Sequence, residues 1–65
     1  MTEREALELA IKRVGSASEL ARQLNITPSA VLLWEKVPPA RILEVERLTG
    51  VSRYDLRPDI CGIAA

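Results

Sequence analysis

The stretch that decides the fold is Ser16-Ala-Ser-Glu-Leu-Ala-Arg-Gln-Leu-Asn-Ile-Thr-Pro-Ser-Ala-Val-Leu-Leu-Trp34, which is typical of two short helices joined by a tight turn. Ser16 and Glu19 have the spacing of a capping box, so we expect the first helix over residues 17–24. Asn25 follows, and asparagine tolerates the left-handed conformation that ends a helix and turns the chain. Thr27 can cap a second helix over residues 28–35, with Pro28 at its first position, where the missing N–H is harmless.

The apolar residues of this stretch predict how the two helices pack. Leu20, Ala21 and Leu24 share one face of the first helix, and Val31 and Trp34 of the second can face them. Ala21 is small where the helices would cross, so the backbones can approach closely. This layout predicts a helix-turn-helix, whose second helix lies in the DNA major groove. The alternative interpretation is a plain helical hairpin in a small bundle.

Residues 7–59 also resemble the small Cro-like phage repressors and the related YdaS-type antitoxins. Four stretches carry the resemblance: Leu20-Ala-Arg-Gln-Leu24, Ile26-Thr-Pro-Ser-Ala-Val31 with Trp34, Val37-Pro-Pro-Ala-Arg-Ile-Leu-Glu-Val-Glu-Arg47, and Thr49-Gly-Val-Ser-Arg-Tyr-Asp-Leu-Arg-Pro-Asp59. It implies a lambda-repressor-like helical domain that binds DNA, often as a dimer on a palindromic operator. Some Cro-like members carry a β-hairpin in place of the C-terminal helices. Asn25 departs from the glycine that is usual in the turn.

The flanking sequence predicts three further helices. The first spans residues 1–14, with Thr2 and Glu5 in a capping box and Gly15 as its stop. Its apolar stripe consists of Leu7, Ala10, Ile11 and Val14. Pro38 pushes Val37 out of the helical region, so the helix at 28–35 must end before it.

The last two predicted helices lie beyond these prolines. Pro39 suits the first turn of a helix that runs to about Thr49 and is ended by Gly50. Its inward residues are Ile42, Val45 and Leu48. A short helix at 51–56 is capped by Ser52, with Asp55 at the box position and Val51 and Leu56 closing the core. We therefore expect an all-α, compact five-helix bundle. Residues 1–59 form the DNA-binding domain, and residues 60–65 form a tail that is disordered or part of a subunit contact.

Length and composition limit the function. A chain of 65 residues forms one domain and buries only about 60% of its unfolded surface, which leaves little room for a catalytic cleft. It has no histidine, no glycine-rich phosphate loop and a single cysteine, Cys61. We expect no enzyme activity, cofactor, metal site or small-molecule substrate. No signal-peptide core or membrane-spanning apolar run is present, which predicts a cytoplasmic protein, and the family resemblance implies that it is bacterial or phage-encoded.

The charge balance counts against DNA binding. Nine basic and nine acidic residues give a net charge of zero, whereas phosphate contacts usually supply much of the affinity. The distribution matters more than the total. Acidic residues gather near the N-terminus and in the helix after Pro39, whereas Arg22, Lys36 and Arg41 lie in or beside the helix-turn-helix. This pattern suggests one basic and one acidic face.

Base contacts are expected from the outward face of the second helix of the motif. With Val31 and Trp34 inward, the outward residues are Thr27, Pro28, Ser29, Leu32 and Leu33. The two hydroxyls can bond phosphate or bases, whereas the leucines can touch only thymine methyls or the groove wall. The resembling families usually carry polar side chains there. Methyl reading is favoured for Leu32, and a core or subunit contact for Leu33.

Phosphate contacts are expected from two sources. The free N–H groups and hydroxyls at Ser16, Ala17 and Ser18 form a helix N-terminus, which attracts anions. Arg22, Lys36 and Arg41 could flank the groove, the alternative being ordinary solvated charges. Glu35 is expected to point away from the DNA.

Together these features predict a sequence-specific, double-stranded DNA-binding transcriptional regulator of the Cro-like repressor type. We expect a weak homodimer that tightens on DNA, with Leu43 and residues 60–63 as the candidate contact. The alternative is an antitoxin or other protein-interaction module with weak or no DNA binding, which Leu32, Leu33 and the neutral charge favour.

Overall fold

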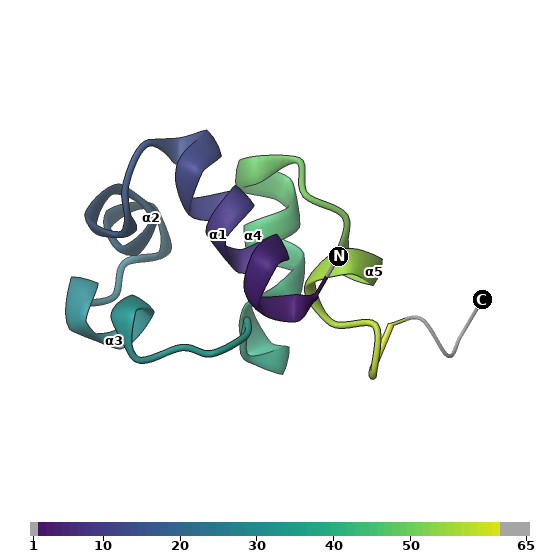
Figure 1. Cartoon of the computed structure of the whole chain (residues 1–65). Helices are drawn as coiled ribbons and strands as arrows, with labels where there is room; N and C mark the ends of the chain where they lie inside the picture. Colours follow the sequence, from purple (N-terminus) through teal and green to yellow (C-terminus); the bar gives the residue numbers. More distant parts are fainter. Residues whose placement is uncertain (1, 62–65) are drawn as a thin grey trace.

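The computed structural model describes residues 2–61, and in this part of the chain all regular secondary structure is helical, with no strand (Figure 1). The elements are α1 (Glu3–Val14), α2 (Ala17–Leu24), α3 (Pro28–Leu32), the short 3-10 helix η1 (Pro39–Arg41), α4 (Ile42–Thr49) and α5 (Arg53–Leu56). The predicted all-α class with five α-helices is confirmed.

The predicted capping box starts α1. Thr2 Oγ1 accepts a hydrogen bond from Glu5 N at 3.1 Å, and Glu5 Oε1 accepts one from Thr2 N at 2.8 Å. Both bonds satisfy N–H groups that have no partner inside the helix. Gly15 ends α1 at a φ of 116°, a conformation that side chains rarely permit, and its N–H bonds Ile11 O. The predicted first residue, Met1, lies outside the described residues.

Helix α1 is the centre of the bundle. It packs against α2, α4 and α5, whereas α3 packs chiefly against α2 (Figure 1). Ala6, Leu7 and Ala10 are its buried residues, and Ile11 and Val14 pack against the edge of the same core. The remaining core residues come from every other α-helix and two loops: Leu20, Ala21, Leu24, Val31, Val37, Ile42, Val45, Val51 and Leu56. Helix α3 is thus attached to one end of the bundle, away from α5.

The loop after α3 differs from the prediction, because α3 ends at Leu32 and not at residue 35. Val37 explains the early end. Its side chain is fully buried in the core, and the helical conformation is disfavoured for a residue that precedes proline, so the chain must leave the helix before it reaches Val37. Arg57 secures the loop from the other end of the sequence, since its Nη1 donates to Val37 O at 2.9 Å.

Helix α4 also differs from the prediction. It begins at Ile42, because Pro39–Arg41 form a separate 3-10 turn, and its inward face is rotated. Ile42 and Val45 are buried as predicted, but Leu48 is 38% exposed and Thr49 is buried in its place. Residues 42, 45 and 49 follow the 3.6-residue helical repeat, whereas a strict three-residue spacing rotates away from the core by residue 48. Thr49 is accommodated because its hydroxyl donates to Val45 O at 2.7 Å and accepts from Val51 N at 3.2 Å.

The last helix is shorter than predicted. It begins at Arg53 and not at residue 51, because Ser52 is its N-cap. The Ser52 hydroxyl accepts a hydrogen bond from Tyr54 N, whereas Asp55 N donates to the Ser52 carbonyl. Val51 and Leu56 are buried as predicted. A further turn follows, in which the N–H groups of residues 60 and 61 both bond Arg57 O. The rest of the predicted tail, residues 62–65, lies outside the described residues.

Candidate nucleic-acid interface

The turn between α2 and α3 is fixed by backbone hydrogen bonds. Asn25 has the left-handed conformation, with a φ of 61°. Ile26 N donates to Ala21 O at 2.9 Å and Asn25 N donates to Arg22 O at 3.2 Å, which is the Schellman pattern that ends many helices. Asparagine fits because it tolerates positive φ better than other side chains do. The predicted turn, including its departure from glycine, is confirmed.

The start of α3 follows directly from this turn. Thr27 Oγ1 accepts a bond from Ala30 N at 3.3 Å, and Pro28 occupies the first helical position. Ile26 and Val31 have the positions of a hydrophobic staple, and both join the core. The staple fixes the angle at which the chain enters α3, so it also fixes which face of α3 is outward.

All five predicted base-contact residues lie on the exposed side of α3. Thr27, Pro28 and Ser29 are exposed, and the exposed fractions of Leu32 and Leu33 are 70% and 82%. The interpretation of Leu33 as a core residue is therefore wrong. It immediately follows the last residue of α3, where the helical rotation turns its side chain away from Val31.

The N-terminus of α2 is open to solvent. Ser16 Oγ accepts a hydrogen bond from Glu19 N at 3.1 Å, as predicted, but the reciprocal bond of a capping box is not formed. The Glu19 carboxylate instead accepts bonds from Arg22 and from Gln23, the latter at 2.9 Å. Ser16 and Ser18 are exposed and Ala17 is partly exposed.

The three basic candidates each have an acidic partner. Arg22 forms a bidentate pair with Glu19, and these bonds lower the pKa of the Glu19 carboxyl and raise the pKa of Arg22. Arg41 Nη1 lies 3.0 Å from Glu44 Oε1. The surface around the motif is therefore mixed in charge, and the expected separation into a basic and an acidic face is not seen at these bases.

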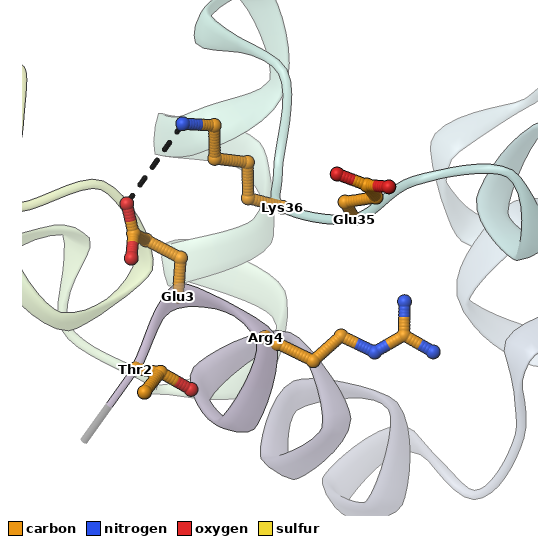
Figure 2. A pocket seen from close by; sticks show the side chains of 5 residues that line it. All are labelled: Thr2, Glu3, Arg4, Glu35 and Lys36. Carbon is orange, nitrogen blue, oxygen red and sulfur yellow. Dashed lines mark ion pairs between the residues drawn. The ribbon is translucent and has the colours of Figure 1, made fainter.

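Lys36 has two acidic partners and lies apart from α3. Figure 2 shows its ammonium directed at Glu3, with a separation of 3.9 Å, and Asp59 Oδ2 lies 3.7 Å away. Lys36 also lines a surface pocket of about 410 Å³ with Thr2, Glu3, Arg4 and Glu35. The pocket lies between the N-terminus of α1 and the loop after α3. Lys36 is therefore close to the motif in sequence but is held at the N-terminus of α1.

Asp59 also forms an ion pair with Arg57. Arg57 donates two hydrogen bonds to its carboxylate, at 3.0 and 2.8 Å. These bonds, with the charges of Arg57 and Lys36, lower the pKa of Asp59 from its ordinary value of 3.8 to about 2. The same hydrogen bonds raise the pKa of Arg57, whose guanidinium is buried. Asp59 is thus ionised throughout the physiological range.

Two residues that shape this surface are not among the sequence candidates. Glu19 neutralises Arg22, and the three-residue spacing on one helix face could have indicated this pair. Arg4 Nη1 donates to Trp34 O at 3.2 Å and so ties α1 to the end of the motif. Arg4 and Trp34 are thirty positions apart, and no local pattern indicates their contact.

Within residues 2–61, no three side chains of the metal-binding types His, Cys, Asp and Glu are grouped closely enough to hold an ion. In this part of the chain, no helix has both the length and the apolar character needed to cross a bilayer.

Comparison with known proteins identifies the family to which this chain belongs. Neither a curated protein nor a solved structure matches the chain significantly. A family model described as "Bacterial toxin YdaS" matches residues 7–64, which is most of the sequence and includes every helix from the middle of α1 onward. This range contains the motif, the loop with Val37 and the turn after α5. The chain therefore belongs to the YdaS family.

Proposed function

We propose that this protein is a sequence-specific, double-stranded DNA-binding transcriptional regulator of the Cro-like repressor type. Helix α3 enters the major groove of an operator, and the N-terminus of α2 meets a phosphate of the adjacent backbone. The protein acts by binding alone, without a cofactor or an enzymatic reaction, and works in the bacterial cytoplasm.

One observation carries this proposal, namely the α2–α3 unit with α3 exposed along its outward side. The Schellman turn at Asn25 and the staple of Ile26 and Val31 fix the angle between the helices. The five candidate base contacts remain outside the core. A helical hairpin that served only as bundle structure would have no need for an exposed second helix carrying two leucines.

Binding-site selection from random DNA, followed by fluorescence-anisotropy titration, tests the proposal. We expect an enriched sequence that binds more tightly than a scrambled duplex of the same composition. The affinity should fall with salt, but less steeply than for a basic domain, because Arg22, Lys36 and Arg41 must exchange carboxylate partners for phosphates. Equal binding to selected and scrambled duplexes would contradict the proposal.

A protein-interaction function within a toxin–antitoxin pair is the second candidate. The description of the matched family and the exposed Leu32 and Leu33 favour it. An apolar protein interface would depend little on salt and would not distinguish DNA sequences. The titration described above therefore separates the two functions.

We also propose a weak homodimer that tightens on DNA. Leu43 and Ile60 are 56% and 45% exposed and lie outside the core, so they are candidates for the contact between copies. Two α3 helices about 34–36 Å apart would match one turn of DNA. Sedimentation should show a concentration-dependent dimer on a palindromic duplex. A monomer in both the free and the bound state would refute it.

A further inference from the structure

The outward face of α3 is apolar at its centre. Leu32 and Leu33 lie on either side of Ser29, rotated from it by about 60° and about 40° at 3.6 residues per turn. They are the two most exposed of the large apolar residues in residues 2–61. The face therefore presents two leucines where a DNA-reading helix would place its base contacts.

We infer that Leu32 and Leu33 select DNA sites by contacting the 5-methyl groups of thymines in the major groove. The inference rests on the proposed function and names the chemistry that this surface recognises. Pro28, Leu32 and Leu33 have no side-chain hydrogen-bond donor or acceptor, and Ser29 has one short hydroxyl. Thymine is the base that offers an apolar group in the major groove, so it is the base that such a face can distinguish.

The size and position of the apolar patch argue against a protein as its occupant. The side chains of Leu32, at the end of α3, and of Leu33, directly after it, supply only a small part of the roughly 800 Å² that each partner of a stable complex buries. The other exposed large apolar residues belong to α4, α5 and the turn that follows: Leu43, Leu48, Tyr54 and Ile60. Helix α5 lies at the opposite end of the molecule from α3, so Tyr54 and Ile60 do not extend the patch into one continuous interface (Figure 1). A methyl contact within a wider DNA interface needs no larger apolar area.

Replacement of thymine by deoxyuridine tests the inference, because it removes the methyl group and leaves base pairing unchanged. Each thymine of the selected half-site is replaced in turn, and the duplexes are titrated with the wild-type protein. At one or two positions we expect binding to weaken about four-fold, the value of one buried methyl group. Because the change is made in the DNA, the fold of the protein is unaffected.

Alanine variants of the protein identify which leucine contacts the thymine methyl group. With Leu32→Ala or Leu33→Ala, the thymine and deoxyuridine duplexes should bind equally at the position that the removed side chain contacts. Leu48→Ala, which removes an exposed side chain on α4, should retain the four-fold difference between the thymine and deoxyuridine duplexes. Circular dichroism should show that both variants are folded, because Leu32 and Leu33 are exposed.

Two results would overturn the inference while leaving the proposed function intact. One is a wild-type protein that prefers its selected duplex over the scrambled one but binds thymine and deoxyuridine equally at every position. The other is a selected site without thymine in the contacted half. If selected and scrambled duplexes bind equally, the proposed function itself fails, and the inference fails with it.

Discussion

At the scale of single residues, Asn25 determines the angle of the motif, and its substitution should show this. Asn25→Ala places an ordinary side chain at a φ of 61° and should lower the free energy of unfolding by about 1–2 kcal/mol. Asn25→Gly is the matched control and should be neutral or slightly stabilising, because glycine adopts this conformation freely. Urea denaturation measures both. Equal stability of the two variants would mean that the turn relaxes out of the left-handed conformation.

Glu19 is the residue whose removal should strengthen DNA binding. Glu19→Gln frees Arg22 and removes a negative charge from the N-terminal turn of α2, so affinity should rise for selected and scrambled duplexes alike. The salt slope should become steeper by about one unit. Stability should change by less than about 1 kcal/mol, since exposed ion pairs contribute little.

The control for this prediction is Glu8→Gln, which breaks the exposed Arg4–Glu8 pair on α1. Anisotropy titrations over a series of salt concentrations compare the two variants. A Glu19→Gln protein with unchanged affinity would show that Arg22 does not approach a phosphate.

At the scale of elements, α3 is short enough for its cap to decide whether it forms. A helix of five residues has few internal hydrogen bonds, and Thr27 satisfies one of its free N–H groups. Thr27→Ala should destabilise the protein by about 1 kcal/mol, whereas Thr27→Ser keeps the oxygen and most of the stability. Backbone chemical shifts of residues 28–32 should move toward coil values in the alanine variant only. Helical shifts retained in Thr27→Ala would show that packing of Val31 alone holds α3.

The elements also show what the sequence can predict. The starts of α1, α2 and α3 depend on Thr2, Ser16 and Thr27 and on bonds spanning three residues, so local pattern predicts them. The end of α3 depends on the burial of Val37 in a core built from the whole chain, and local pattern misplaces it. The outward face of α3 was predictable because the burial of Val31 alone sets the rotation of a short helix.

At the scale of the whole molecule, the contacts that hold the site together join distant segments. Lys36 meets Glu3 and Asp59, and Arg57 meets Val37 across twenty positions. Spacing rules for helices describe neighbours three or four positions apart and so contain no information on these pairs. For this reason the sequence predicted Lys36 as a basic residue near the motif but could not place it between two carboxylates.

The ion pairs of Asp59 with Arg57 and Lys36 form a charge network, which predicts that the stability of the folded protein falls at acidic pH. The pKa of Asp59 is about 2 in the folded protein and near its ordinary 3.8 in the unfolded chain, so between these values the unfolded state binds more protons. The contribution of Asp59 is fully present above about pH 5 and is lost as the pH falls through 4 toward 2. Urea midpoints from pH 2 to 6 measure it.

Asp59→Asn should reduce the steepness of this decline. The carboxyls of Glu5 and Glu19 also have lowered pKa values and should maintain part of the slope in the variant. Asp55→Asn removes one negative charge from α5, where Asp55 forms no ion pair with any of residues 2–61, and it is the matched control. Identical pH profiles for wild type and Asp59→Asn would contradict the network.

The hydrogen bond from Arg57 to the Val37 carbonyl also marks a boundary between two parts of the molecule that should differ in local stability. In the loop before Val37, the contacts to the bundle are the exposed hydrogen bond from Arg4 to Trp34 O and the exposed ion pairs of Lys36, whereas Val37 is fully buried and its carbonyl accepts a bond from Arg57. We therefore expect helix α3 to open locally, as far as this point, while α1, α4 and α5 stay folded as a single cooperative unit. Hydrogen–deuterium exchange should be fast for the amides of α3 and slow, at the global unfolding limit, for those in the middle of α1. On this prediction, the segment proposed to read DNA adjusts to the groove without loosening the bundle that carries it.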